Sequence, residues 1–236
     1  MTPKPASSKL SQGPNKPPLA GPAGPSAQLA LGALLVALAL ALAGCGLEKA
    51  YPVINTFDVS PTWPAPTIVK VRPFVVRVNQ LGVAAAYETR KLIYKSRQGQ
   101  MLEDFYNELV APPGRLLADG LATYLDLTSP DAQFVRSQGQ KSADFVLEGY
   151  LAEFLGDFTQ DPPVARIVLA ATLNDVRRER VGIVLSRTYQ AQTPFVEGRG
   201  RAAQELSQAL TAAYGQIIKS LEEDLREFFR GQKKGR

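Results

Sequence analysis

The fold is decided by three neighbouring stretches: DFVLEGYLAEF (144–154), VARIVLAATLND (164–175) and VGIVLSRTYQA (181–191). In the second stretch, Ala165, Ile167 and Leu169 recur at every other position, which is the period of a strand with one buried face. Short connections, rich in glycine, proline and charge, separate the three stretches. Because connections this short favour antiparallel neighbours, we predict a three-strand meander.

The segment that follows the meander predicts a long amphipathic helix over 199–229. Its apolar residues step by three or four positions and its charged residues fill the other side. The apolar positions are Ala202, Leu206, Leu210, Ala213, Ile217, Leu221, Leu225 and Phe228. At 1.5 Å per residue this helix would be about 45 Å long, more than a small sheet covers, so we expect part of it to overhang.

The residues before the meander predict further strands and one more helix. Strands are expected over 67–78, interrupted at Pro73, over 91–95 and over 102–106. A helix is expected over 113–127, with Pro113 in its first turn. This order predicts an α+β fold with a mostly antiparallel sheet and both helices packed on one face, which leaves the other face to solvent or a partner.

The N-terminal region has the organisation of an export signal. Residues 1–28 are rich in Pro, Gly, Ser and Ala, and they carry three lysines and no acid. Residues 29–43 (LALGALLVALALALA) are uncharged. As a helix they would reach about 22 Å, short of the roughly 30 Å core of a bilayer, which is typical of a signal-peptide h-region.

The apolar run ends at Leu42-Ala43-Gly44-Cys45, which resembles a bacterial lipobox. In that chemistry the cysteine thiol takes up a diacylglyceryl group, small residues before it admit the peptidase, and the cysteine becomes the acylated first residue. We therefore predict lipidation at Cys45, the single cysteine of the chain. The alternative is a stray cysteine at the end of an apolar helix. By analogy with enterobacterial sorting, Gly46 in place of aspartate favours the outer membrane.

These features divide the chain into four parts. We predict a lipoprotein signal peptide over 1–44, a lipidated N-terminus with a proline-rich tether over 45–66, an α+β domain over 67–230 and a basic tail over 231–236. The tether has one possible short strand, and it would hold the domain some tens of ångströms from the lipid. The net charge of +5 comes largely from the two ends of the chain, so no concentrated basic face, and no nucleic-acid partner, is expected.

The composition removes several kinds of catalytic and metal site. The chain has no histidine, which is the commonest general base and zinc ligand. Its single cysteine allows no intrachain disulfide and no cysteine cluster. Neither a nucleophile-elbow motif nor a phosphate-binding loop is present. We therefore predict a protein that is not an enzyme, with no catalytic residue, no metal and no cofactor.

Two enzymatic alternatives would depend on particular residues. Glu148 and Glu153 would suit an acid pair, but their odd spacing places them on opposite faces of a regular strand. A serine–lysine dyad, the basis of a periplasmic hydrolase, would draw on the residues of one small set. That set is Ser96, Ser137, Ser142, Lys95 and Lys141. Nothing in their spacing supports the dyad.

An aromatic cluster stands between the first strand and the first helix. It contains Tyr87, Tyr94, Phe105 and Tyr106, and Trp63 precedes it in the tether. Core packing is the simpler interpretation. The functional one is an exposed patch for a lipid tail or a partner.

Several of these segments together resemble the ABC-type transport auxiliary lipoproteins. The resemblance lies in Arg90–Tyr94, in Phe105–Asn107, in Ala111-Pro112-Pro113 with Leu116-Leu117, and in Ala143–Gly149, followed by the closing helix. It spans about 53–229. The resemblance implies a non-enzymatic lipoprotein whose partners are membrane lipid, through acylated Cys45, and an MCE-type periplasmic subunit or ABC permease complex.

What the resemblance implies about function is the movement of phospholipids or other hydrophobic molecules across the periplasm. Two alternatives stay open. One is a structural lipoprotein that assists envelope assembly, such as lipopolysaccharide or pilus export. The other is a periplasmic carrier that binds lipid itself, for which the small side chains of Ala165, Ala170 and Ala171 leave room.

Overall fold

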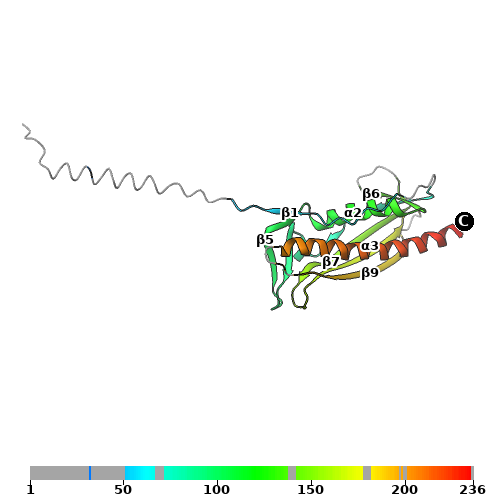
Figure 1. The fold of residues 1–236 in the computed structure, drawn as a ribbon. Coiled ribbons are helices and arrows are strands. Elements are labelled where there is room, and N and C mark those ends of the chain that lie inside the picture. The colour runs from blue at the N-terminus through cyan, green and yellow to red at the C-terminus, as the bar shows by residue number, and fades with distance from the viewer. Residues whose placement is uncertain are drawn as a thin grey trace, which may run out of the picture. The chain divides into compact units, whose positions relative to one another are not determined.

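The computed structural model describes residue 32 and residues 51–66, 72–137, 142–177, 182–196, 198 and 201–234. Residues 52–236 form one compact unit (Figure 1). Its elements are β1 (Asn55–Phe57), β2 (Phe74–Val78), β3 (Gly82–Val83), the 3-10 turn η1 (Ala85–Tyr87), β4 (Lys91–Lys95), β5 (Met101–Leu109), α2 (Pro113–Thr128), β6 (Ala132–Arg136), β7 (Phe145–Asp157), β8 (Val164–Asp175), β9 (Gly182–Pro194) and α3 (Ala202–Lys234). Cys45 lies outside the described residues.

The long strand β7 is the centre of the sheet. One of its edges pairs antiparallel with β8 along its whole length, from Phe145 opposite Asp175 to Asp157 opposite Val164. β8 in turn pairs antiparallel with β9. The predicted three-strand meander is therefore confirmed, and alternating residues of β8 fill the core as the sequence pattern indicated.

The other edge of β7 is shared by shorter strands in parallel orientation. β2 pairs with its beginning, β3 with its middle and β4 with its end. β6 lies beyond β2, and β5 and β1 lie beyond β4. The sheet is thus mixed: the antiparallel ladders are the longest, and the parallel pairing of β2 with β6 was not predicted. The connection between these two strands runs from β3 through α2. β1 brings the chain into the domain before the predicted start at residue 67.

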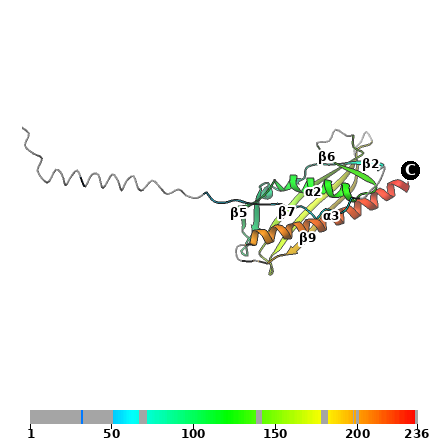
Figure 2. The same ribbon diagram turned by 45° about the horizontal axis from the view of Figure 1, so that its top comes forward.

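Both helices cover the same face of this sheet, as predicted (Figures 1 and 2). The buried residues of α3 run from Leu206 to Phe229, and they include six of the eight predicted positions. Ala202 and Phe228 are only half-buried, whereas Tyr214, Ile218 and Phe229 are buried without having been predicted. The expected overhang is wrong, because Phe229 near the end of α3 is 1% exposed. The reason is that β7 and β9 are long strands of 13 residues each. Phe145, the first residue of β7, packs against Phe229 and so covers the end of the helix.

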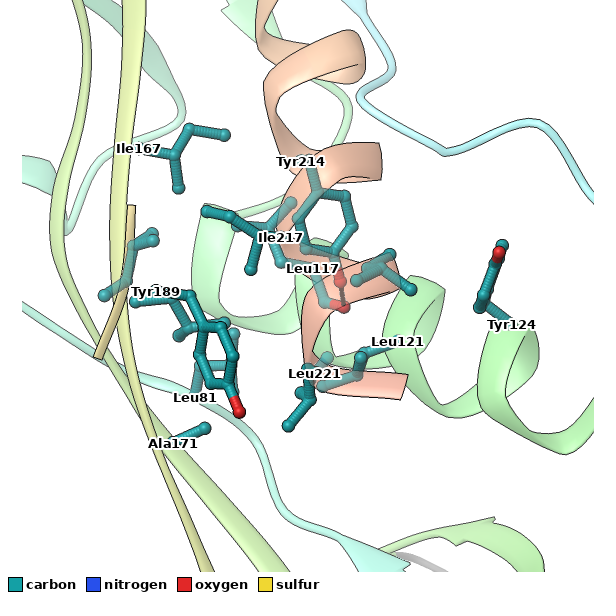
Figure 3. Close-up of a cluster of buried hydrophobic side chains, with 14 of the residues drawn as sticks. Leu81, Leu117, Leu121, Tyr124, Ile167, Ala171, Tyr189, Tyr214, Ile217 and Leu221 are labelled. Atoms are coloured by element: carbon teal, nitrogen blue, oxygen red, sulfur yellow. Dashed lines mark hydrogen bonds between the residues drawn. The ribbon is translucent and has the colours of Figure 1, made fainter. Parts of the chain in front are cut away.

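The two helices are joined at the centre of the core by a buried tyrosine (Figure 3). The hydroxyl of Tyr214 in α3 donates a hydrogen bond to the carbonyl of Leu117 in α2. Burial raises the pKa of Tyr214 above its ordinary value, so its hydroxyl stays protonated and keeps donating. Around this bond pack Leu121 of α2 and Ile167 of β8, each at most 1% exposed. None of the helices in the described part of the chain is both long and apolar enough to cross a membrane.

Candidate docking surfaces

The two acids of β7 lie on the same face of the sheet, contrary to expectation. A β-bulge shifts the register of β7 against β8 just before Glu153. Because of this shift, the side chain of Glu153 lies on the same outward face of the strand as that of Glu148. Glu148 accepts hydrogen bonds from the side-chain amides of Asn79 (3.1 Å) and Asn174 (3.0 Å). Glu153 forms an ion pair with Arg166 at 2.5 Å. Both carboxylates therefore make cross-strand contacts on the helix-free face.

The serine–lysine candidates are not brought together into a described site. The hydroxyl of Ser96 accepts a hydrogen bond from the backbone N–H of Gln100 at 3.1 Å, within the β4–β5 turn. Ser137 lines a different region, a hollow that it shares with Arg115 and Arg136. Lys141 lies outside the described residues. Within the described ranges, no group of three or more acidic or cysteine side chains is placed to hold a metal ion.

The predicted aromatic cluster divides between core and surface. Tyr87 is buried, and its pKa is raised by burial first and by the charge of Glu153 second. Tyr94 is partly buried, and burial raises its pKa as well. Phe105 and Tyr106, in contrast, are 65% and 54% exposed. Core packing is thus confirmed for Tyr87, whereas Phe105 and Tyr106 are exposed and their binding role stays a prediction.

A hollow of about 760 Å³ lies between β1, β5 and the start of α3. Its most connected side chain is Asp104, whose carboxylate accepts hydrogen bonds from the hydroxyl of Tyr94 (2.8 Å) and from the backbone N–H of Tyr106 (2.8 Å) and Asn107 (3.0 Å). The Asn107 side chain continues the network to Asn55 at 3.0 Å. The lining is largely polar, which suits water better than an acyl chain.

Besides this hollow, the edge of the sheet at β9 is a second candidate docking surface. Among the described strands, β9 pairs only with β8, and it is 13 residues long. Its inner face is held to α3, where the hydroxyl of Tyr189 and the guanidinium of Arg187 both contact Asp224. At its beginning, Ile183 is 70% exposed and Val184 is 38% exposed. The sequence predicted this strand but gave no signal that it would form the edge.

The fold resembles solved structures with TM-scores above 0.5. Protein XCC0632 from Xanthomonas campestris, a DUF330 protein, matches with a TM-score of 0.58 at 19% identity, covering 79% of this chain and 99% of that one. An uncharacterised protein matches with a TM-score of 0.57 at 14% identity, covering 73% and 99%. The hypothetical protein CT253 from Chlamydia trachomatis reaches a TM-score of 0.48 at 10% identity, covering 66% of this chain and 97% of that one.

These comparisons correct the family assignment. No family model matches the sequence, and neither does any curated protein. The assignment to the ABC-type transport auxiliary lipoproteins is therefore wrong, because the neighbours above a TM-score of 0.5 are a DUF330 protein and an uncharacterised protein. Its motifs are packing motifs: Leu92, Leu117 and Leu147, for example, are each at most 1% exposed, and such positions follow from the architecture. At identities this low, the comparisons establish the shared fold.

Proposed function

We propose that this chain is a lipid-anchored, non-enzymatic protein of the bacterial cell envelope whose domain binds a protein partner. Acyl chains on Cys45 would hold it to a membrane, with the domain facing the periplasm and the outer membrane favoured. The lipobox 42–45 after an uncharged 29–43 segment supports the anchor. Two or more acyl chains anchor a protein stably, whereas one chain does so marginally.

The observation that carries the partner-binding role is the edge of β9. An edge strand presents unpaired backbone N–H and C=O groups, which can pair with a strand from another chain. Many proteins protect such edges with lysine, proline or short length, whereas β9 has 13 residues, exposes Ile183 and Val184, and has its one proline at its end. Since α3 fixes the inner face of β9, a partner strand would meet an already ordered edge.

The partner we propose is a periplasmic MCE-type subunit or an ABC permease complex of a lipid-transport system, and no nucleic acid. That identity was implied only by the resemblance corrected above, so the support for partner binding is the edge of β9 itself. A structural role in envelope assembly would use the same edge. Direct carriage of lipid is less well supported, because Ala165 and Ala171 pack in the core at 0% and 2% exposure, and the hollow beside Asp104 is polar.

Photo-crosslinking in intact cells tests this function. A photoreactive phenylalanine analogue at Ile183 should crosslink to a partner protein, whereas the same analogue at Tyr150, which is 49% exposed on the helix-free face, should not. Ile183→Lys with Val184→Lys should reduce recovery of that partner roughly tenfold, because two desolvated charges oppose strand pairing.

The identity of the crosslinked protein then separates the candidates. An MCE-type or ABC component supports the transport role, and a component of lipopolysaccharide or pilus export replaces it with the assembly role. Equal crosslinking at Tyr150 and Ile183 would move the binding surface from the edge to the face. No crosslink at either position, in protein shown by mass to be acylated, would refute partner binding by the sheet.

A further inference from the structure

One end of the domain exposes apolar side chains that come from two segments of the chain. The parallel pairing of β1 with β5, Asn55 opposite Asn107, brings the residues before Asn55 alongside those before Asn107. We call this set the anchor-end patch. It consists of Val53 (79% exposed), Ile54 (53%), Met101 (46%), Leu102 (49%), Phe105 (65%) and Tyr106 (54%).

The exposure of Phe105 and Tyr106 is built into β5. Ile93 of β4 pairs with Glu103, but Lys91 pairs with Glu108, so β5 carries extra residues between these two pairs. The carboxylate of Asp104 accepts the backbone N–H of Tyr106 at 2.8 Å and so fixes this bulge. The rings of Phe105 and Tyr106 contact each other edge to face, at 5.1 Å between centroids. The bulge therefore displays an ordered aromatic pair.

The chain leaves the domain at this same end, toward the predicted lipid. The compact unit begins at Pro52, and Val53 is the next residue. Fully extended, the chain from Cys45 to Pro52 reaches at most about 25 Å. A spacer this short keeps the anchor-end patch near the membrane surface, whereas a tether reaching to residue 66 would have released it.

We propose that the anchor-end patch rests in the interfacial region of the membrane that holds Cys45. This inference depends on the proposed function, because it requires the acyl anchor. Tyrosine is enriched at the level of the headgroups, where its ring meets apolar and its hydroxyl polar surroundings. Phenylalanine supplies the apolar contact in segments that lie at this interface. Two charges beside the patch are balanced, since Lys91 and Glu103 form an ion pair at 3.1 Å. The carboxylate of Asp104 is hydrogen-bonded to the hydroxyl of Tyr94 and the backbone N–H of Tyr106. Tethering also raises the effective concentration of the patch at the lipid, so a modest intrinsic affinity is sufficient.

Lipid-quenching measurements on the acylated full chain test this contact. Cys45 is the chain's single cysteine, so once it is acylated an introduced cysteine is the sole free thiol. A fluorescent label at Met101→Cys, in vesicles of phosphatidylethanolamine and phosphatidylglycerol with brominated acyl chains, should be quenched. A label at Ile183→Cys, a matched exposed apolar position on β9, should not. In the Met101→Cys background, Phe105→Ser with Tyr106→Ser should reduce the quenching several-fold.

Mass analysis of Cys45 and flotation with vesicles distinguish a failure of this inference from a failure of the proposed function. If mass analysis finds Cys45 unmodified and the protein does not float with vesicles, the proposed function itself fails. If the acylated protein floats but the Met101 label is quenched no more than the Ile183 label, this inference alone is overturned and the patch belongs to a protein partner or a second copy. Circular dichroism of the serine variant confirms that its fold is retained.

Discussion

At the scale of single residues, Asp157 is a buried carboxylate whose charge is stabilised by its neighbours. It is 3% exposed at the end of β7. Burial by itself would raise its pKa, but hydrogen bonds from the hydroxyl (2.6 Å) and backbone N–H (3.0 Å) of Thr159, together with the charges of Lys95 and Arg166, outweigh burial. The pKa of Asp157 therefore lies below its ordinary value in the folded state.

The sign of the pH dependence follows from that shift. Because the unfolded state binds the proton more readily, Asp157 stabilises the fold above the ordinary carboxyl pKa, and this contribution is lost as the pH falls through the folded-state value. We expect Asp157→Asn to lower the free energy of unfolding by about 1 kcal/mol at neutral pH and by much less in acid. Urea unfolding at both pH values measures this. An equal loss at both would show that packing, and not charge, is the role of this side chain.

At the scale of the elements, the start of α2 packs closely against the chain before it. A Cβ at Gly114 would stand 2.5 Å from the carbonyl oxygen of Leu81 and 2.6 Å from a methyl group of Val83. Glycine to alanine within a helix usually stabilises a protein by about 0.5–1 kcal/mol. Here the contact with backbone reverses the sign, so we expect Gly114→Ala to destabilise by roughly 1–3 kcal/mol.

The same helix supplies the control for that change. At Gly120 the nearest atom to a new Cβ would be a ring carbon of Tyr214 at 3.5 Å, an ordinary contact. Gly120→Ala should therefore leave stability unchanged or raise it slightly, by the helix-propensity term alone. Thermal unfolding of the two variants, followed by circular dichroism, compares them directly. Two variants of equal stability would contradict the close packing of α2 on Leu81.

Elements with a clear period were predictable, and those set by distant pairing were not. α2, α3 and the β7–β9 meander follow from local spacing, because each buries one regular face. β6 was missed, since Gln133 and Arg136 interrupt its apolar residues and its partner β2 is far away in sequence.

The bulge before Glu153 reverses the face of every later residue of β7, and no residue type there signals it. The bulge that exposes Phe105 depends likewise on Asp104 contacts that only the fold creates.

At the scale of the whole molecule, the folded unit and the predicted lipid anchor belong to separate parts of the chain. Residues 52–236 form one compact unit, and within the described residues the buried hydrophobic core begins at Val59. The lipidation predicted at Cys45 lies before both. The candidate site divides in the same way: its lipid anchor is a prediction from residues 42–45, whereas the β9 edge and the anchor-end patch required the sheet order.

This separation makes a direct prediction for a chain that begins at residue 46 and is exported by a cleavable signal without a lipobox. Because every described core residue is retained, we expect its unfolding temperature by circular dichroism to equal that of the mature lipoprotein. Fractionation should find it released from the membrane pellet, because no acyl chain remains and a small interfacial patch binds lipid reversibly. A lower unfolding temperature would show that residues before 46 stabilise the domain. Full retention in the pellet would show that the domain is held by a partner or by its own patch, and that the acyl chains are dispensable for its location.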